Sequence, residues 1–305
     1  MKSIINKKNI KKYYSFIFFI ICILIFLGII IYFFYKNNEY YGVFCKLQQP
    51  LVSPPEIMRK LPISGENNND IIFLNSDELF TILSSDNDNY YKTFLNYDFS
   101  TRNIKNIDDY IPKIKKSVCN FTDLEKKKVI KSINYINSKI NNLKLPYFNG
   151  NLVSKIPWKL GLIDGTLYEN GYPHTRNDVI ILSRNTINAE RNMNEGFDSI
   201  IDKSFTQTLI HERIHIYQKM YPKYVKIYLS KNNFMKIKDR DVNDNIRANP
   251  DINQIVYKDE GGNIYKATYN NNPKTIGDIN YASGNNQSFE HPYEKMAIEF
   301  EKYIN

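Results

Sequence analysis

The longest regular pattern of hydrophobic and polar positions lies between Thr122 and Pro146. Thr122 and Glu125 stand three residues apart, as in the capping box that opens many helices, and Pro146 marks where such a helix must end. Between them, apolar residues recur at the three- and four-residue spacing of one helical face, at Leu124, Ile130, Ile133, Ile136, Ile140 and Leu143. The pattern predicts an amphipathic helix whose apolar face packs on a core.

Strands are predicted in the middle of the chain. Trp158–Ile163 is a short apolar run that leads into a glycine-containing turn region, and Asp178–Leu182 contains consecutive β-branched residues. Residues 240–285 are rich in Asn, Asp and Gly and hold shorter strands that contain tyrosine, such as Gly262–Thr268.

Two further helices are predicted in the C-terminal half. The first runs from about Ser199 to Met220 and is closed by Pro222, and the second runs from Pro292 to Tyr303. This mixture of strands and helices predicts an α+β fold.

A different pattern occupies the N-terminus. From Tyr13 to Tyr35 the chain carries no charged residue, and about 20 apolar residues at 1.5 Å per residue span roughly 30 Å, the hydrocarbon thickness of a bilayer. Five lysines precede this segment, whereas only Lys36 and Lys46 flank its far side, so the positive-inside rule places the N-terminus in the cytosol. The sequence therefore predicts an uncleaved single-pass anchor, with the rest of the chain on the lumenal or extracellular side of a cellular or viral membrane.

Composition narrows the class of protein. The chain has 305 residues, of which 42% are hydrophobic and 24% charged, and this excludes a fully disordered polypeptide. Its net charge of +9 would suit a nucleic-acid-binding protein, but six of the 41 basic residues lie near the N-terminus and the rest is near balance, with 35 basic and 32 acidic residues. We therefore expect no nucleic-acid partner. With 3 cysteines and no Cys-x-x-Cys pair, a disulfide-rich scaffold and a zinc ribbon are also excluded.

One motif in the helix predicted before Pro222 carries chemistry. His211-Glu212-Arg213-Ile214-His215 places two histidines one helical turn apart on one face, where both can bind a zinc ion at about 2.0–2.1 Å. Glu212 then lies beside the metal, where a carboxylate can take a proton from an activated water. With 4 histidines in the chain, random placement yields only roughly 0.002 such matches. The sequence predicts His211 and His215 as zinc ligands and Glu212 as the catalytic base.

The third protein ligand has several candidates. A catalytic zinc needs three protein ligands and an open position, yet no metzincin-type His follows, because the next residues are Ile216-Tyr217-Gln218-Lys219. The last predicted helix begins at His291-Pro292-Tyr293-Glu294, which places Glu294 in its first turn. We expect Glu294 to be the third ligand. The alternatives are His291, Glu290, Glu299 and Glu301.

These two motifs resemble those of a known family. The run Thr208–Gln218, followed further along the chain by His291–Ala297, resembles gluzincin-type zinc metallopeptidases, in particular those encoded by large DNA viruses, whose second motif has the form H/N-P-x-E-x-x-A. The upstream Gly171–Thr175 segment is similar to that group as well. The resemblance covers roughly residues 155–303.

The resemblance implies a zincin-like fold, in which a small sheet packs on an active-site helix and a C-terminal ligand helix. It implies zinc bound by His211, His215 and Glu294, with Glu212 as the base. It also implies that the strand Asp178–Leu182 borders the cleft, where a peptide substrate could pair with it as with an edge strand.

Peptide hydrolysis at such a site needs a second electrophile for the tetrahedral oxyanion, besides the metal. The candidates are His174, Tyr265, Tyr269, Tyr281, His291 and Tyr293. Arg247–Asp251 is expected to form a turn near the cleft.

The sequence thus predicts a membrane-anchored zinc metallopeptidase that acts on a peptide or protein substrate. Its predicted order is a basic cytosolic tail (1–12), a transmembrane helix (13–35), a stalk (36–70), a helical N-terminal part of the ectodomain (71–150) and the metallopeptidase domain (151–305). Two alternatives remain: a membrane-anchored interaction protein with a structural or inactive zinc site, and an unrelated zinc hydrolase of other amides. The presence of Glu212 argues against a structural site, which needs no carboxylate beside the metal.

Overall fold

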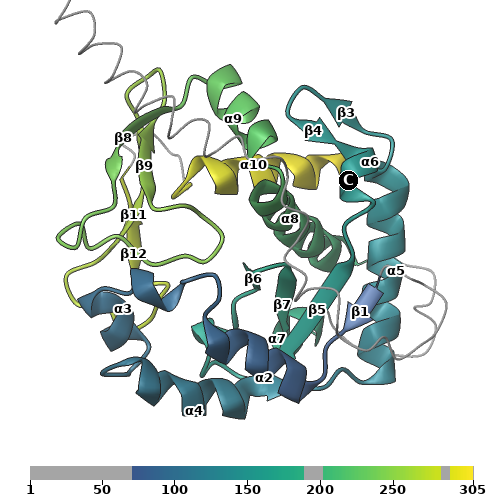
Figure 1. The fold of residues 1–305 in the computed structure, drawn as a ribbon, viewed down its shortest axis with the longest axis horizontal. Helices are drawn as coiled ribbons and strands as arrows, with labels where there is room; N and C mark the ends of the chain where they lie inside the picture. Colours follow the sequence, from purple (N-terminus) through teal and green to yellow (C-terminus); the bar gives the residue numbers. More distant parts are fainter. Residues whose placement is uncertain (1–70, 189–201, 283–288, 305) are drawn as a thin grey trace, which may run out of the picture. The chain divides into compact units, whose positions relative to one another are not determined.

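The computed structural model describes residues 71–188, 202–282 and 289–304 (Figure 1). Its N-terminal elements are β1 (Ile71–Phe73), α2 (Ser76–Ser85), η2 (Tyr91–Thr93), α3 (Asn96–Thr101), α4 (Ile107–Ser117), β2 (Val118–Cys119), α5 (Asp123–Ile140), β3 (Lys144–Leu145), β4 (Phe148–Asn149) and α6 (Gly150–Val153). The central elements are β5 (Trp158–Ile163), η3 (Glu169–Gly171), β6 (His174–Arg176), β7 (Val179–Ser183), α7 (Arg184–Asn188), α8 (Lys203–Met220) and α9 (Pro222–Lys231). The last are β8 (Met235–Asp239), β9 (Ile255–Lys258), β10 (Ile264–Tyr265), β11 (Ala267–Tyr269), β12 (Ile279–Tyr281), α10 (Pro292–Glu301) and η5 (Lys302–Ile304).

A mixed five-stranded sheet lies at the centre. Its strand order is β1-β5-β7-β6, and β2 also pairs with β5. β1, β5 and β7 run parallel, whereas β6 is antiparallel to β7 and β2 is antiparallel to β5. Residues 71–150, which the sequence predicts to be helical, therefore also supply two strands of this sheet.

Both faces of the sheet are covered, which explains why its central strands are continuous apolar runs rather than alternating ones. In β7, Ile180 and Leu182 face a cluster that includes residues of α5 and α8. Val179 and Ile181 face a second cluster with α2 and α4. Gly161 of β5 belongs to this second face, where its missing side chain leaves room for Leu79 of α2.

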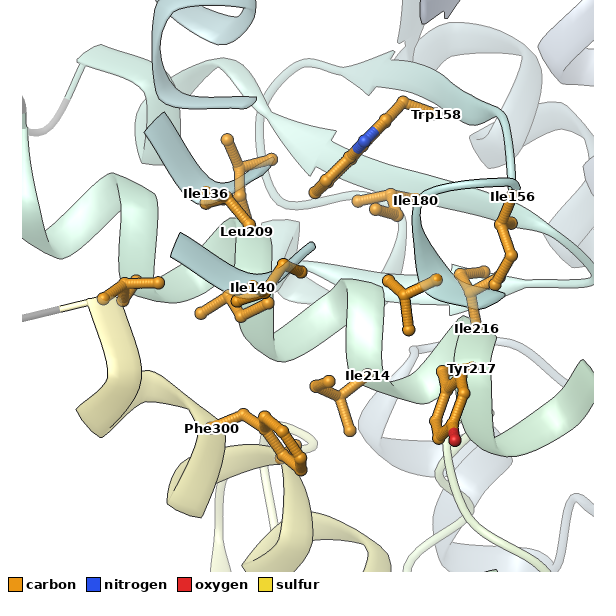
Figure 2. Packing of buried hydrophobic residues seen from close by; sticks show 14 of the residues in the cluster. Ile136, Ile140, Ile156, Trp158, Ile180, Leu209, Ile214, Ile216, Tyr217 and Phe300 are labelled. Carbon is orange, nitrogen blue, oxygen red and sulfur yellow. The ribbon is translucent and has the colours of Figure 1, made fainter. Parts of the chain in front are cut away.

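Helix α8 is packed in the core against several other elements. It packs on α10 and α5 and against β6 and β7, and Figure 1 shows it between the central sheet and α10. Figure 2 shows the apolar side chains of α5, α8, α10 and β5 that meet there. Arg213 of α8 is buried and donates to the backbone oxygens of Pro157, Val153 and Ile156, with its guanidinium over the Trp158 ring. These contacts fix the orientation of α8 about its own axis.

The predicted helix after Thr122 is confirmed, but its buried face differs from the predicted apolar face. Thr122 caps α5 through the capping box with Glu125. Ile136 and Ile140 are fully buried, but Leu124 is 55% exposed, whereas Glu125 in the same turn and Val129, neither of them predicted, are buried. The helix ends at Ile140, ahead of Pro146, and the β3–β4 hairpin follows.

The predicted membrane architecture is corrected. No helix in the described ranges is both long and apolar enough to cross a bilayer. The two longest, α5 and α8, have 18 residues each, and both carry several charged side chains. The predicted fold class with a transmembrane helix and the predicted single-pass localisation therefore find no support, and the described fold is α+β with mixed sheets. The predicted span at 13–35, the tail before it and the stalk at 36–70 lie outside the described residues.

Candidate metal centre

Three side chains from two helices converge in the structure. His211 and His215 stand one turn apart on α8, and Glu294 lies in the first turn of α10. Glu294 Oε2 lies 3.1 Å from His211 Nε2 and 3.6 Å from His215 Nε2. One ligand atom from each residue lies within 4.8 Å of the others, so the sequence-predicted donors are brought together.

This donor set fits a tetrahedral zinc ion. Two ligand atoms that each bind zinc at about 2.0–2.1 Å lie roughly 3.4 Å apart at tetrahedral geometry, close to the two nitrogen–oxygen separations found here. His215 Nε2 is buried and makes no hydrogen bond among the described residues, which is a costly state for an imidazole nitrogen. A cation between the three donors would satisfy it.

Outer hydrogen bonds orient each donor. His211 Nδ1 lies 3.0 Å from Glu301 Oε1, and His215 Nδ1 lies 2.9 Å from Gln218 Oε1. Asn249 Nδ2 donates to Glu294 Oε1 at 2.9 Å, which leaves Oε2 toward the histidines. Metal-binding histidines usually bond a carboxylate or carbonyl oxygen through their second ring nitrogen, and both histidines here follow that rule.

Glu294 and the two histidines shift each other's pKa. Burial raises the pKa of the Glu294 carboxyl, but the two histidines outweigh it and hold that pKa well below its usual range. Burial lowers the pKa of His211, whereas its hydrogen bonds to Glu294 and Glu301 outweigh this and raise it. An ionised carboxylate between imidazoles is a site that attracts positive charge.

Glu212 lies beside these donors without joining them. It is 4% exposed and lines the cleft, and its Oε2 has no hydrogen-bond partner in the described residues. Burial and the nearby Asp251 raise the pKa of its carboxyl to about 8, against the opposing effect of His211 and His215. A cation bound by the neighbouring donors would lower this pKa, because positive charge favours the ionised carboxylate that a general base requires.

The other ligand candidates have different partners. Glu290 pairs with Arg247, and Glu299 accepts a hydrogen bond from Tyr228. His291 caps α10 by accepting from the backbone N–H of Tyr293, and its second nitrogen contacts Asn253.

A cleft of about 690 Å³ opens onto His211 and Glu294. It is lined by His174, Tyr281 and all five residues of the predicted turn Arg247–Asp251, whereas His291, Tyr265, Tyr269 and Tyr293 do not line it. Tyr269 instead bonds the buried Asp98, and Tyr293 bonds Asn253. Of the six oxyanion candidates, the structure thus places two on the cleft wall.

The predicted edge strand is also corrected. The strand predicted at Asp178–Leu182 is β7, which lies between β5 and β6, so β6 covers its outer edge from Val179 to Ile181. The edge strand on this side is β6, because β5 pairs with all of β7 on one side and β6 pairs with Val179–Ile181 on the other.

Two supporting residues were missed by the sequence analysis. Gln218 stands three residues after His215 on one helix face, and this spacing could have identified it. Asn249 lies 45 positions before Glu294, and no local signal links the two.

Comparisons with protein-family models, with characterised proteins and with solved structures find no match to this chain.

Proposed function

We propose that this protein is a zinc-dependent metallopeptidase that hydrolyses peptide bonds. The observation that carries the proposal is the convergence of His211, His215 and Glu294 within 4.8 Å, with Glu212 beside them on the wall of a cleft. Oε2 of Glu212 bonds to none of the described residues. A purely structural zinc site is closed by four protein ligands, whereas three ligands and a free carboxylate are typical of a catalytic one.

The roles of the side chains follow from their positions. His211, His215 and Glu294 would hold the zinc, and Glu301, Gln218 and Asn249 would orient them. When bound, zinc lowers the pKa of a coordinated water toward 7 and polarises a carbonyl group.

Glu212 would move the proton. Its carboxylate accepts a proton from the attacking water and then donates it to the nitrogen of the leaving amine. Because Oε2 has no other partner among the described residues, no hydrogen bond has to break before this transfer.

Metal analysis of the full chain, coupled to cleavage of a quenched peptide library, tests the proposal. We expect one zinc per chain and measurable hydrolysis. Glu212→Gln should keep the zinc but lower turnover by about 10²–10⁴-fold, because the amide cannot accept the proton. Glu260→Gln is the matched control, since Glu260 is exposed, accepts a hydrogen bond from Asn233 and does not line the cleft.

Each other outcome has a defined meaning. Turnover of Glu212→Gln within a few-fold of wild type, at equal zinc content, removes Glu212 from the mechanism. Stoichiometric zinc with no hydrolysis favours a structural metal, and cleavage restricted to non-peptide amides favours an unrelated zinc hydrolase.

A further inference from the structure

β6 is the edge strand of the central sheet beside the metal site, yet its outward backbone groups are already bonded. In an antiparallel pair, alternate residues turn both N–H and C=O away from the partner strand. In β6 the residue that turns both groups away from β7 is Thr175. Its N–H donates to Asp251 Oδ1 at 2.8 Å, and its C=O accepts from Lys219 Nζ at 3.0 Å. A peptide therefore cannot add to β6 as a further strand without displacing Asp251 and Lys219.

His174, the preceding residue of β6, has one ring nitrogen without a partner. Its Nδ1 lies 2.9 Å from the backbone oxygen of Tyr172, and its ring packs near Tyr168 with centroids 5.4 Å apart. Nε2 is enclosed and bonds to none of the described residues. Leaving such an atom unsatisfied costs roughly 1–3 kcal/mol. Since His174 lines the cleft, a ligand can supply the missing partner.

The surroundings of His174 determine which nitrogen carries the hydrogen. A carbonyl oxygen can only accept, so Nδ1 must donate to Tyr172. Burial lowers the pKa of His174 despite Glu169 and Asp251, with Arg176 acting in the same direction as burial, and the ring is neutral near pH 7. Nε2 therefore presents a lone pair. It accepts hydrogen bonds and cannot donate one to an oxyanion, the role that sequence analysis considered for this residue.

We propose that His174 Nε2 accepts a hydrogen bond from a backbone N–H of the bound peptide and thereby sets the peptide's position in the cleft. The inference rests on the proposed peptidase function. His174 supplies the acceptor that an open β6 edge would have offered through the carbonyl of Thr175.

The charges around His174 favour a neutral amide over an N-terminal ammonium group. Glu169 lies near the ring but forms an ion pair with Arg102 at 2.6 Å. Asp251 lies near it too and faces Lys219 at 3.6 Å. Both carboxylates are compensated, so this part of the wall has no excess negative charge to attract a cation.

Binding measurements with backbone-modified peptides test the inference. The probe is a fluorescent peptide that the wild-type chain cleaves, in a series in which each amide N–H is replaced in turn by N-methyl. Affinities are measured on the zinc-loaded full chain carrying Glu212→Gln, with His174 and with His174→Phe. We expect one N-methyl position to weaken binding about 5- to 100-fold with His174 and to have almost no effect with His174→Phe.

Phenylalanine keeps a planar ring near Tyr168 but is larger and also removes the Nδ1 hydrogen bond to Tyr172. Zinc content and unfolding midpoint are therefore compared to exclude a purely structural effect. As an independent readout, ¹⁵N NMR of the imidazole should show His174 protonated at Nδ1 and not at Nε2 in the wild-type chain. This spectrum needs no substrate, so it reports on the acceptor state even if His174→Phe does not fold.

Three results overturn the inference. In the first, N-methylation weakens peptide binding equally with His174 and with His174→Phe. In the second, the NMR spectrum shows His174 protonated at Nε2. In the third, the effect of His174→Phe on binding depends on the peptide's N-terminal ammonium group and not on an amide N–H, so that it disappears when the peptide is acetylated. These results are distinct from failure of the proposed function, in which the wild-type chain cleaves no peptide and the inference falls with it.

Discussion

The side-chain amide of Asn249 donates to Glu294 Oε1 at 2.9 Å, while the other oxygen of this carboxylate faces His211 and His215. The same nitrogen lies 2.6 Å from Glu290 Oε1. A loop residue thus holds the candidate ligand of α10 in the orientation that a shared metal ion requires.

Asn249→Ala should weaken zinc binding about 10- to 100-fold, because Glu294 loses the bond that orients it. The measurement is competition with a fluorescent zinc chelator. Asn243→Ala is the control, since Asn243 is exposed and its hydrogen bonds among the described residues go to Asp241 in its own turn. Equal zinc affinity of Asn249→Ala and wild type would show that Asn249 does not orient the carboxylate.

Glu301→Ala should lower zinc affinity by about 10-fold, because Glu301 Oε1 lies 3.0 Å from His211 Nδ1 and orients that ring. Glu301→Gln keeps an acceptor oxygen and should have a smaller effect. Glu299→Ala provides the comparison on the same helix, since Glu299 bonds Tyr228 and not a candidate ligand. The idea fails if Glu301→Ala and Glu299→Ala bind zinc equally well in the chelator assay.

The buried pair of Glu169 and Arg102 should make the fold sensitive to acid. Burial by itself raises the pKa of the Glu169 carboxyl, but Arg102 and Tyr110 bond it and lower its pKa to about 2, against 4.5 when unpaired. Because the folded-state pKa is depressed, the stabilisation is complete above pH 4.5 and is lost as the pH falls toward 2. The loss is on the order of 3 kcal/mol.

Urea unfolding followed through the fluorescence of Trp158, the chain's single tryptophan, measures this at a series of pH values. Glu169→Gln should be less stable than wild type near pH 6, and the difference should shrink as the pH falls. If the difference in unfolding free energy between the two proteins stays constant down to about pH 2.5, the pair of Glu169 and Arg102 is not the source of the acid sensitivity.

Gly161→Ala should destabilise the fold by about 1–3 kcal/mol. A Cβ at this position of β5 would lie 2.5 Å from Leu79 Cδ1 of α2, so the Leu79 side chain or one of the two elements must shift. In a Leu79→Ala background the same substitution should cost much less, because the clashing methyl groups are gone. Unfolding free energies of the four proteins form a double-mutant cycle, and additive effects would contradict the close contact.

The sequence alone was sufficient where short-range geometry decides the structure. The i, i+4 spacing of His211 and His215 places both on one face of any helix, so their proximity follows from the chain itself. The capping box at Thr122 and the apolar run of β5 are local signals of the same kind, and both elements begin where they were predicted. Pro292 and His291 likewise mark the start of α10 through capping alone.

Tertiary structure decided everything that joins distant segments. Leu124 fits the apolar spacing of α5 but lies in solvent, because the packing of the whole helix selects which part of its face is covered. Glu301 reaches His211 across 90 positions, and Asp251 reaches Thr175 across 76. Such contacts depend on how α8, α10, β6 and the Arg247–Asp251 turn pack together, and hydrophobic periodicity carries no information about that arrangement because it repeats over only a few residues.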